Sequence, residues 1–406
     1  MSDPSHHTTV ELRRGAYHDS VSLMQVSRQV AATHGVVAAQ VAMATELNVE
    51  VLTGMGFDIP QEAGANDLVI ALRGESAEAL QDGLAAVEEA LAGLRSAGRG
   101  GTGMGEAPPA RTIGSAARRG EANLALISVP GQHAVTETFD AIAAGLSVML
   151  FSDNVSVEDE IRLKDAAATA EVLVMGPDCG TAMVRGVALG FANAVSEGAV
   201  GLVAASGTGA QQVMCLLDAA GVGVSHCLGV GGRDLKSAVA GRSTRQALAA
   251  LADDPQTSSV VVVSKPPDDT VLAEVEAYAD ELGLRVHWAI LGQGRPDLTA
   301  AVEATLVSLG ESVPTWPAHT AAAEPEGLTT GPDLRGLFCG GTLADEAMIV
   351  ATDLLGAPIR SNIAQNEALR VSGNERLEGH LVIDFGDDEM TQGRAHPMID
   401  PSLRME

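Results

Sequence analysis

The pattern of hydrophobic and polar positions divides this chain of 406 residues into segments of different character. Up to about residue 95, strand-like and helix-like segments alternate three times, which predicts a small α+β domain. From residue 122, short unbroken apolar runs such as LALISV and LSVMLF are separated by stretches long enough for helices. Such runs suit strands buried on both faces, and helical spacers imply right-handed crossovers. The pattern therefore predicts an α/β fold with two consecutive, doubly wound parallel-sheet domains.

The domain boundaries are expected where the pattern changes. Segments rich in Gly, Ala, Pro or Thr without periodicity are predicted linkers. The final unit is short, and we expect a partner chain to complete its sheet. The expected divisions are 1–95 for the amino-terminal α+β domain, 96–121 for a linker, 122–197 and 198–310 for the two α/β domains, 311–333 for a second linker, and 334–406 for a carboxyl-terminal α/β unit.

Composition and charge exclude several classes of partner. Lys plus Arg number 25 against 53 Asp plus Glu, and the resulting net charge of −28 argues against nucleic acid as a partner. The four cysteines lie far apart without a CxxC spacing, which fits a reducing compartment. No apolar run is long enough to span a bilayer. We therefore expect a cytoplasmic protein without membrane contact.

Turns that follow predicted strands are the candidate binding sites, because open α/β sheets bind ligands beyond the carboxyl ends of their strands. The turn after VGLVAAS opens a helix, so its amides can converge on an anion. It lacks a GxGxxG pattern, so no NAD is expected. A helix N-cap and a small buried thiol remain alternative interpretations of the same residues. The anion-binding candidates are Ser206, Gly207, Thr208 and Gly209, together with Gly176, Asp178, Cys179, Gly180 and Thr181 of the turn after VLVM.

Two further turns carry the charged candidates. LGVGGRDL offers Gly231 and Gly232 for close backbone approach, with Arg233 as an anion-binding fork and Asp234 to orient it. Lys265 ends the apolar strand VVVVS as a point charge. Arg233, Lys265 and Asp234 are the predicted catalytic residues. A surface ion pair and a lysine that extends into solvent are the alternatives.

The last loop and one helix start complete the set of candidates. Clustered carboxylates in IDFGDDEMTQGRAHPMID suit Mg²⁺ or a basic loop of a second chain, although their spacing matches neither an EF-hand nor a zinc motif. A solvated acidic turn is the alternative, and the identity of any metal stays open. The metal candidates are Asp384, Asp387 and Asp388, near Arg394, His396 and Asp400; the substrate or CoA candidates are Pro130, Gly131 and His133.

Several motifs, in this order, resemble the succinyl-CoA synthetase α-subunit superfamily and, more closely, its FdrA branch. YHDSVSLMQVSR resembles the FdrA amino-terminal domain, and ALISVPGQHAVTETF with VMGPDCGTA resembles a Rossmann-like CoA-binding domain. VGLVAASGTGAQQV and LGVGGRD resemble the flavodoxin-like second domain, and GGTLADEAM resembles the FdrA carboxyl-terminal region. The resemblance implies that the turns at 176–181 and 206–209 face one phosphoryl or acyl-phosphate site.

The FdrA resemblance implies carbamoyl transfer between phosphate and oxalurate, or a similar ureide, in purine and allantoin nitrogen catabolism. It also implies separate partner subunits in an oligomer. In the synthetases a phosphohistidine follows the strand that here reads HWAILGQGRPDL, and this chain has no histidine there. Carbamoyl transfer needs no such carrier, so phosphate or carbamoyl phosphate is the expected cosubstrate. An NDP-forming acyl-CoA ligase α-like subunit that uses CoA, and a non-catalytic scaffold subunit, are the alternatives.

Overall fold

The structure, a computed structural model, describes most of the chain and divides into two compact units, Met1–Pro109 and Ala110–Glu406. Each unit is described by itself. Parts of the two predicted linkers, residues 98–109 and 319–331, lie outside the described residues. The described residues are 7–16, 18, 20–60, 62–64, 66–97, 110–318, 332–371, 378–391 and 397–399.

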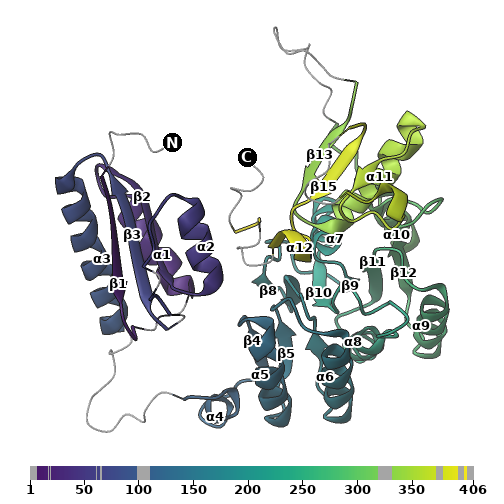
Figure 1. The fold of residues 1–406 in the computed structure, drawn as a ribbon. Coiled ribbons are helices and arrows are strands. Elements are labelled where there is room, and N and C mark those ends of the chain that lie inside the picture. Colours follow the sequence, from purple (N-terminus) through teal and green to yellow (C-terminus); the bar gives the residue numbers. More distant parts are fainter. Residues whose placement is uncertain are drawn as a thin grey trace. The chain divides into compact units, whose positions relative to one another are not determined.

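The first unit is an antiparallel three-stranded sheet in the order β1-β3-β2, covered by helices (Figure 1). The central strand alternates between two cores: Leu68, Ile70 and Leu72 pack with α1 and α3, whereas Val69 and Ala71 pack beside α2. This confirms the predicted alternation of strands and helices. Its elements are β1 (His7–Arg13), α1 (Ser20–Ala31), β2 (Val36–Met43), α2 (Glu46–Gly54), β3 (Leu68–Gly74) and α3 (Ala77–Ala97).

The second unit begins with a parallel three-stranded sheet in the order β4-β5-β6. Consecutive strand order places the two crossover helices on one face, where α5 and α6 pack together. The reversal that defines a doubly wound sheet is therefore not found among these three strands. Helix α4 lies inside the predicted linker 96–121, because Thr112 and Ser115 form a capping box there. The elements are α4 (Ile113–Ala117), β4 (Leu124–Ile127), α5 (Gly131–Ala143), β5 (Ser147–Leu150), α6 (Val157–Thr169) and β6 (Val174–Met175).

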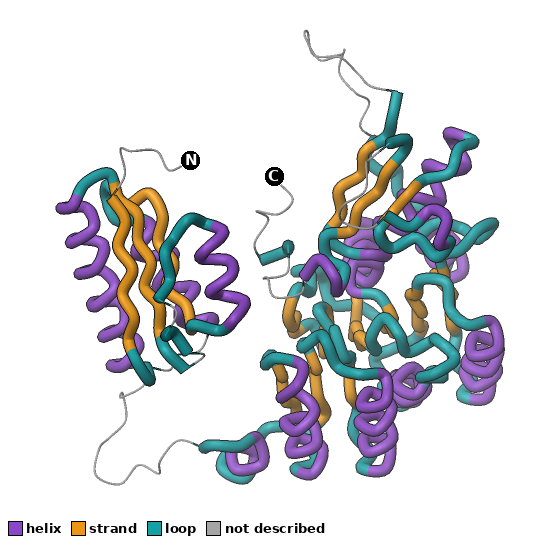
Figure 2. The backbone as a smooth tube through the Cα atoms, viewed as in Figure 1, coloured by secondary structure: helices purple, strands orange, loops and turns teal. Residues whose placement is uncertain are grey.

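A six-stranded sheet follows, in the order β12-β11-β9-β10-β7-β8. Figure 2 shows strands in orange and helices in purple. Strands β9 to β12 are parallel, and their order reverses at β9, as the flavodoxin-like expectation requires. Helices α8 and α9 pack on one face and α7 and α10 on the other. The elements are β7 (Thr181–Val184), β8 (Val187–Gly190), β9 (Val200–Ala205), α7 (Gly207–Ala219), β10 (Val224–Gly229), α8 (Arg242–Ala252), β11 (Ser259–Ser264), α9 (Asp269–Glu281), β12 (Val286–Ile290) and α10 (Leu298–Leu309).

The hairpin β7–β8 corrects the predicted boundary at residue 197. The sequence analysis assigned these strands to the first α/β domain. In the structure β7 pairs antiparallel with β10, so the hairpin extends the second sheet. Its strands are only four residues long, so no long apolar run in the sequence predicted them.

The carboxyl-terminal segment forms a small parallel sheet in the order β13-β15-β14, beside α11. Its own buried core is small and consists of Ala344, Ile359 and Val382. Helix α11 also packs against α7 of the larger sheet. No described helix combines the length and the apolar character that a membrane crossing requires. The elements are β13 (Arg335–Phe338), α11 (Gly341–Leu355), β14 (Arg360–Ser361), the 3₁₀ helix Glu367–Leu369, β15 (Leu381–Asp384) and α12 (Asp388–Thr391).

Candidate anion-binding site

The reversal of strand order places the candidate site at the carboxyl ends of β9 and β11. In a flavodoxin-like sheet the ligand crevice lies beyond the strands at this point. Strand β9 leads into Ser206 and helix α7, and neighbouring β11 leads into Lys265. Two of the turns singled out from the sequence are thus neighbours in space.

The amino ends of α7 and α11 meet at this edge. The Ser206 hydroxyl accepts a hydrogen bond from the Gly209 amide at 2.9 Å and shares one with the Thr342 hydroxyl at 2.5 Å. A Cβ atom on Gly340 would overlap the Thr208 side chain, so the two helix starts are in direct contact. Neither helix has an acidic residue in its first turn, and the N-cap residue of α11 is a glycine, whose amide donates a hydrogen bond to Asp384 of β15. Two positive helix ends with amide donors therefore converge here.

Lys265 adds a cation beside the start of α11. A Cβ atom on Gly341 would lie 3.0 Å from Lys265 Nζ and 3.2 Å from Asp384 Oδ2. In the described part of the chain, no residue forms a hydrogen bond or ion pair with the Lys265 ammonium. Burial raises the pKa of Asp345 to about 6, although the nearby Lys265 opposes the shift. Burial also raises the pKa of Asp384. Lys265 therefore shares this edge with two carboxyl groups whose ionised forms burial disfavours, and it forms no direct ion pair with either.

The turn at 176–181 comes close to the same edge through one residue. Thr181 Oγ1 lies 3.7 Å from the position of a Cβ atom on Gly207, and it accepts a hydrogen bond from Gln211. Cys179, by contrast, is buried in the core, and burial raises the pKa of its thiol to about 12. The structure therefore favours the buried-thiol alternative for Cys179.

The remaining glycines of these turns provide close approaches between backbones. A Cβ atom on Gly231 would lie 2.8 Å from the carbonyl oxygen of Pro177, so the turns after β6 and β10 touch. Gly176 packs on the Leu150 carbonyl, Gly180 on the Phe191 ring, and Gly232 near the end of β9. Asp178 is exposed in a left-handed conformation with φ of 56°. The close approach predicted at these glycines is present, and it brings loops of the protein into contact with one another.

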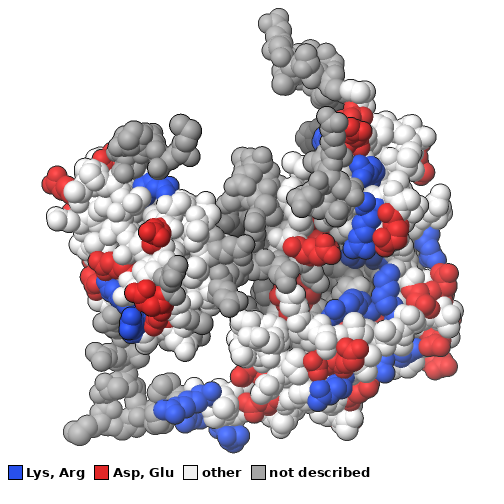
Figure 3. Space-filling model, in the orientation of Figure 1, with Lys and Arg blue, Asp and Glu red and all other residues white. Residues whose placement is uncertain are grey.

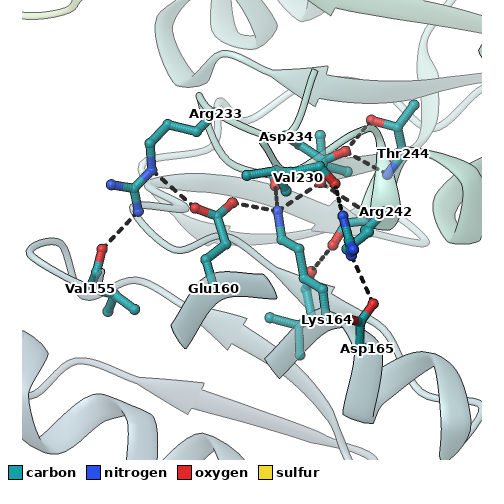
Figure 4. A network of polar contacts seen from close by, with 12 residues as sticks. Val155, Glu160, Lys164, Asp165, Val230, Arg233, Asp234, Arg242 and Thr244 are labelled. Carbon is teal, nitrogen blue, oxygen red and sulfur yellow. Dashed lines mark hydrogen bonds and ion pairs between the residues drawn. The ribbon is translucent and has the colours of Figure 1, made fainter. Parts of the chain in front are cut away.

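Asp234 does not orient Arg233, which corrects the sequence-based prediction (Figure 4). The Arg233 guanidinium donates to Glu160 at 3.0 Å and to the Val155 carbonyl at 2.8 Å. Asp234 is fully buried and accepts hydrogen bonds from the amides of Ser243 and Thr244 and from the Thr244 hydroxyl. It thereby caps α8, whose own N-cap residue is a glycine without a side-chain acceptor.

Lys164 lies at the centre of this buried network. Its ammonium donates to Glu160 at 2.7 Å, to Asp234 at 2.7 Å and to the Val230 carbonyl at 2.9 Å. All three of its donors are used, and the side chain is fully buried. The network connects α6 of the first sheet to the loop after β10 of the second. Asp234 therefore serves the structure between two sheets rather than an exposed anion site.

The other predicted site residues lie on separate parts of the unit. Pro130 precedes α5, Gly131 packs on the backbone of the loop after β5, and His133 is exposed on the first turn of the helix. Asp387 accepts from the Glu389 amide, Asp388 begins α12, and Arg394, His396 and Asp400 lie outside the described residues. The described residues bring no three His, Cys, Asp or Glu side chains together as a metal site.

On the face drawn in Figure 3, the Lys and Arg side chains (blue) form small groups among the Asp and Glu side chains (red).

Two contributors to the site were not predicted from the sequence, namely the start of α11 and Asp345. Gly340, Gly341 and Thr342 open α11 with the same small-residue pattern that Ser206–Gly209 shows, and that pattern could have marked them as a second helix start at the site. Asp345 carried no signal, because only the packing of α11 on α7 brings it toward Lys265.

Comparisons with known proteins give a family match, curated relatives and solved structures. A family described as "AllF, heavy metal-associated domain" matches residues 5–108. Uncharacterized protein YahF of Escherichia coli (strain K12) is 39% identical over 421 residues, covering 98% of this chain and 79% of that protein. The succinate–CoA ligase [ADP-forming] subunit alpha 2 of Archaeoglobus fulgidus is 31% identical over 44% of this chain and 62% of its own length. A dinucleotide-forming acetyl-coenzyme A synthetase 1 of Ca. Korarchaeum cryptofilum, solved with phosphate and ADP, has a TM-score of 0.37 at 17% identity, covering 53% of this chain and 46% of that one.

Over 44% of its length the chain is similar in sequence to a succinate–CoA ligase α-subunit, so this part of it is CoA-ligase-like. Because YahF matches nearly the whole chain, the chain belongs to the YahF-like, FdrA-type family. It spans about three-fifths of the length of the ligase subunit that it matches.

The residues of the first unit do not fit the heavy metal that its family description mentions. Heavy-metal sites favour soft thiolate ligands. All four cysteines of the chain lie at position 179 or later, so residues 5–108 contain none. Residues 5–108 therefore match this family without a cysteine thiolate to hold a soft metal.

Proposed function

We propose that this chain is a subunit of an FdrA-type carbamoyltransferase that handles carbamoyl phosphate and an N-carbamoyl substrate such as oxalurate, in purine and allantoin nitrogen catabolism. The observation that carries the proposal is Lys265, a cation without a described partner, beside the meeting amino ends of α7 and α11. In a chain of net charge −28, such a positive site is suited to one specific anion.

The reaction requires stabilisation of negative charge. A phosphate oxygen attacks the carbamoyl carbon and forms a C–O bond. The C–N bond then breaks, and its electron pair leaves with the nitrogen, which takes a proton. Negative charge develops on the carbamoyl oxygen and persists on the phosphate. Fixed amide donors and a lysine ammonium stabilise both charges, because they need no reorganisation during the reaction.

A second candidate function is that of an α-like subunit of an NDP-forming acyl-CoA ligase. Its support is the sequence identity with succinate–CoA ligase subunits. That reaction would require CoA and a partner that binds the nucleotide. The turn from Leu291 to Asp297, after β12, contains no histidine to carry phosphate, so we rank this function second.

A thermal-shift panel with phosphate, carbamoyl phosphate, CoA, ATP and ADP tests the two functions, because a ligand of the native state raises Tm. Carbamoyl transfer predicts a rise with phosphate or carbamoyl phosphate and none with CoA. A clear rise with CoA favours the ligase. No rise with either phosphate compound, alone or with co-purified partner subunits, contradicts the proposal.

Variants at the site make the panel specific. Lys265→Ala removes the cation and is expected to abolish the rise with phosphate. Ser206→Pro removes a backbone donor from the turn and is expected to reduce it. Arg285→Ala is the matched control, since it removes an exposed cation beside the opposite, amino end of β12. Equal shifts in all three variants would exclude this site as the phosphate site.

A further inference from the structure

The distribution of lysine in this chain is unusual. Of the 25 Lys plus Arg residues only three are lysines, Lys164, Lys236 and Lys265, and all three belong to the second compact unit. All the other residues in this count are arginines. Lysine is a compact point charge with three rotatable donors, whereas arginine is a planar fork. Lys236 and Lys265 are therefore two of only three such ammonium groups among the side chains of this sequence.

The buried network accounts for Lys164, whose three donors are all used. The other two lysines lie together at the candidate site. Lys236 donates a hydrogen bond at 2.5 Å to the carbonyl of Pro266, the residue that follows Lys265. The Asp268 amide donates to the Leu235 carbonyl at 2.9 Å and holds the two loops together.

The two ammonium groups repel each other. Partial burial lowers the pKa of Lys236, and the positive charge of Lys265 lowers it further. The carboxylates around them are Asp345, which faces both lysines, Asp384, which faces Lys265, and Asp268, which faces Lys236.

These carboxylates form no direct ion pair with the lysines. Within the described residues, neither ammonium has a carboxylate oxygen within ion-pair distance. Burial disfavours the ionised forms of Asp345 and Asp384. Two ammonium groups that lie close together without a direct ion pair are suited to share one anion.

We propose that Lys236 and Lys265 together clamp the phosphoryl group of the ligand, with Lys236 as a second cation of the site that no sequence motif marks. The inference rests on the proposed function, since it assigns the charge partner of the same anion. The ligand class is a phosphate dianion, either free or at the end of an acyl phosphate. Lysine ammonium groups suit it because each donates to a separate phosphate oxygen.

Amine labelling of the full chain tests the clamp directly. Lys164 is fully buried and serves as an unreactive internal reference, whereas Lys236 is exposed and Lys265 is partly exposed. We expect an acetylating N-hydroxysuccinimide ester to label Lys236 and Lys265, as measured by peptide mass spectrometry. Inorganic phosphate is expected to slow both reactions at least fivefold, and chloride at the same ionic strength is not.

The labelling outcomes separate this inference from the proposed function. Protection of both lysines supports the clamp. Protection of Lys265 alone overturns the clamp and leaves the proposed anion site intact. If neither lysine is protected and phosphate causes no rise in Tm, both the clamp and the proposed site are wrong.

Substitution gives a second measurement. Lys236→Met keeps the length of the side chain and removes its charge, and we expect phosphate to bind at least tenfold more weakly in calorimetric titration. Lys236→Arg is expected to bind phosphate more tightly than Lys236→Met but less tightly than the wild type, because arginine keeps the positive charge on a planar guanidinium instead of a compact ammonium. Arg285→Met, at the amino end of β12, is the charge-matched control and is expected to bind like the wild type. Unchanged affinity in a folded Lys236→Met protein would overturn the proposal.

Discussion

Lys164 shows how a charged side chain can be part of a core. Two carboxylates and a carbonyl oxygen surround its ammonium, and none of the charged atoms faces solvent. Ions buried in this way are tolerated only when partners satisfy every donor and acceptor. Removal of one member therefore costs far more than the loss of a surface ion pair.

We predict that Lys164→Met lowers the free energy of unfolding of the second unit by about 3–5 kcal/mol, because Glu160 and Asp234 would be left buried without a cation. Arg242→Met is the control at the same interface. Arg242 pairs with Asp165 near the surface, so its loss is expected to cost about 1 kcal/mol or less. Urea unfolding measures both changes. Similar costs for the two variants would contradict the account of the network.

Asp345 predicts a pH-dependent effect on stability. Its pKa rises from 3.8 to about 6 on folding, so between these values the native state binds more protons than the unfolded chain. Its contribution to stability therefore falls as the pH rises through this range and stays lower above it. Asp345→Asn removes the cost of a buried carboxylate and is expected to stabilise the protein by about 2 kcal/mol at pH 8.

Unfolding of Asp345→Asn and wild type at several pH values measures this effect. The stability difference is expected to shrink as the pH falls toward 4. A difference that does not change with pH would contradict the assignment of the effect to ionisation of Asp345.

At the scale of elements, the contact between α7 and α11 depends on the absence of a side chain at Gly340. We predict that Gly340→Ala pushes the helix starts apart, weakens the Ser206–Thr342 bond and costs about 1–3 kcal/mol. The rise in Tm with phosphate is expected to be lost as well. Gly93→Ala, on α3 where a Cβ atom has free space, is the control and is expected to stabilise by about 0.5–1 kcal/mol. A normal rise in Tm with phosphate in Gly340→Ala would show that phosphate binding does not depend on the contact between α7 and α11.

The elements also show which parts of the fold the sequence could predict. Strands β9 and β11 are buried on both faces, so their unbroken apolar runs identified them and the turns that follow. The β7–β8 hairpin and the two-residue β14 are too short for any periodicity. Local pattern therefore predicts long buried elements and misses short ones, whose pairing depends on the tertiary fold.

The candidate site was predicted in part for the same reason. The Ser206 turn and Lys265 follow strands and could be located from sequence. The true partner of Asp234 is Lys164, 70 positions away on helix α6, and no local pattern connects them. Lys236 and Asp345 join the site only through the packing of loops and of α11.

At the scale of the whole molecule, α11 presents apolar side chains to solvent. Val350 and Leu354 lie one turn apart on this helix, and Leu354 is 80% exposed. Leu337 on β13 is also exposed. We propose that a partner subunit covers this surface, in line with the small core of the terminal unit.

We predict that a double variant, Leu337→Asp with Leu354→Asp, keeps the wild-type Tm within about 2 °C, because both side chains are exposed. It is expected to lose association with the partner subunits in size-exclusion chromatography of co-expressed proteins. Loss of association without loss of fold would assign the surface to assembly. Unchanged association would show that the partner binds elsewhere.

The β7–β8 hairpin connects the two α/β sheets structurally. Its chain leaves the first sheet, completes the edge of the second, and places Gly190 against Met149 of the first. A gene fragment that ended between the two predicted domains would remove an edge from one sheet and expose the side of the other. We therefore expect the two α/β sheets to fold together, whereas the amino-terminal residues form a compact unit of their own.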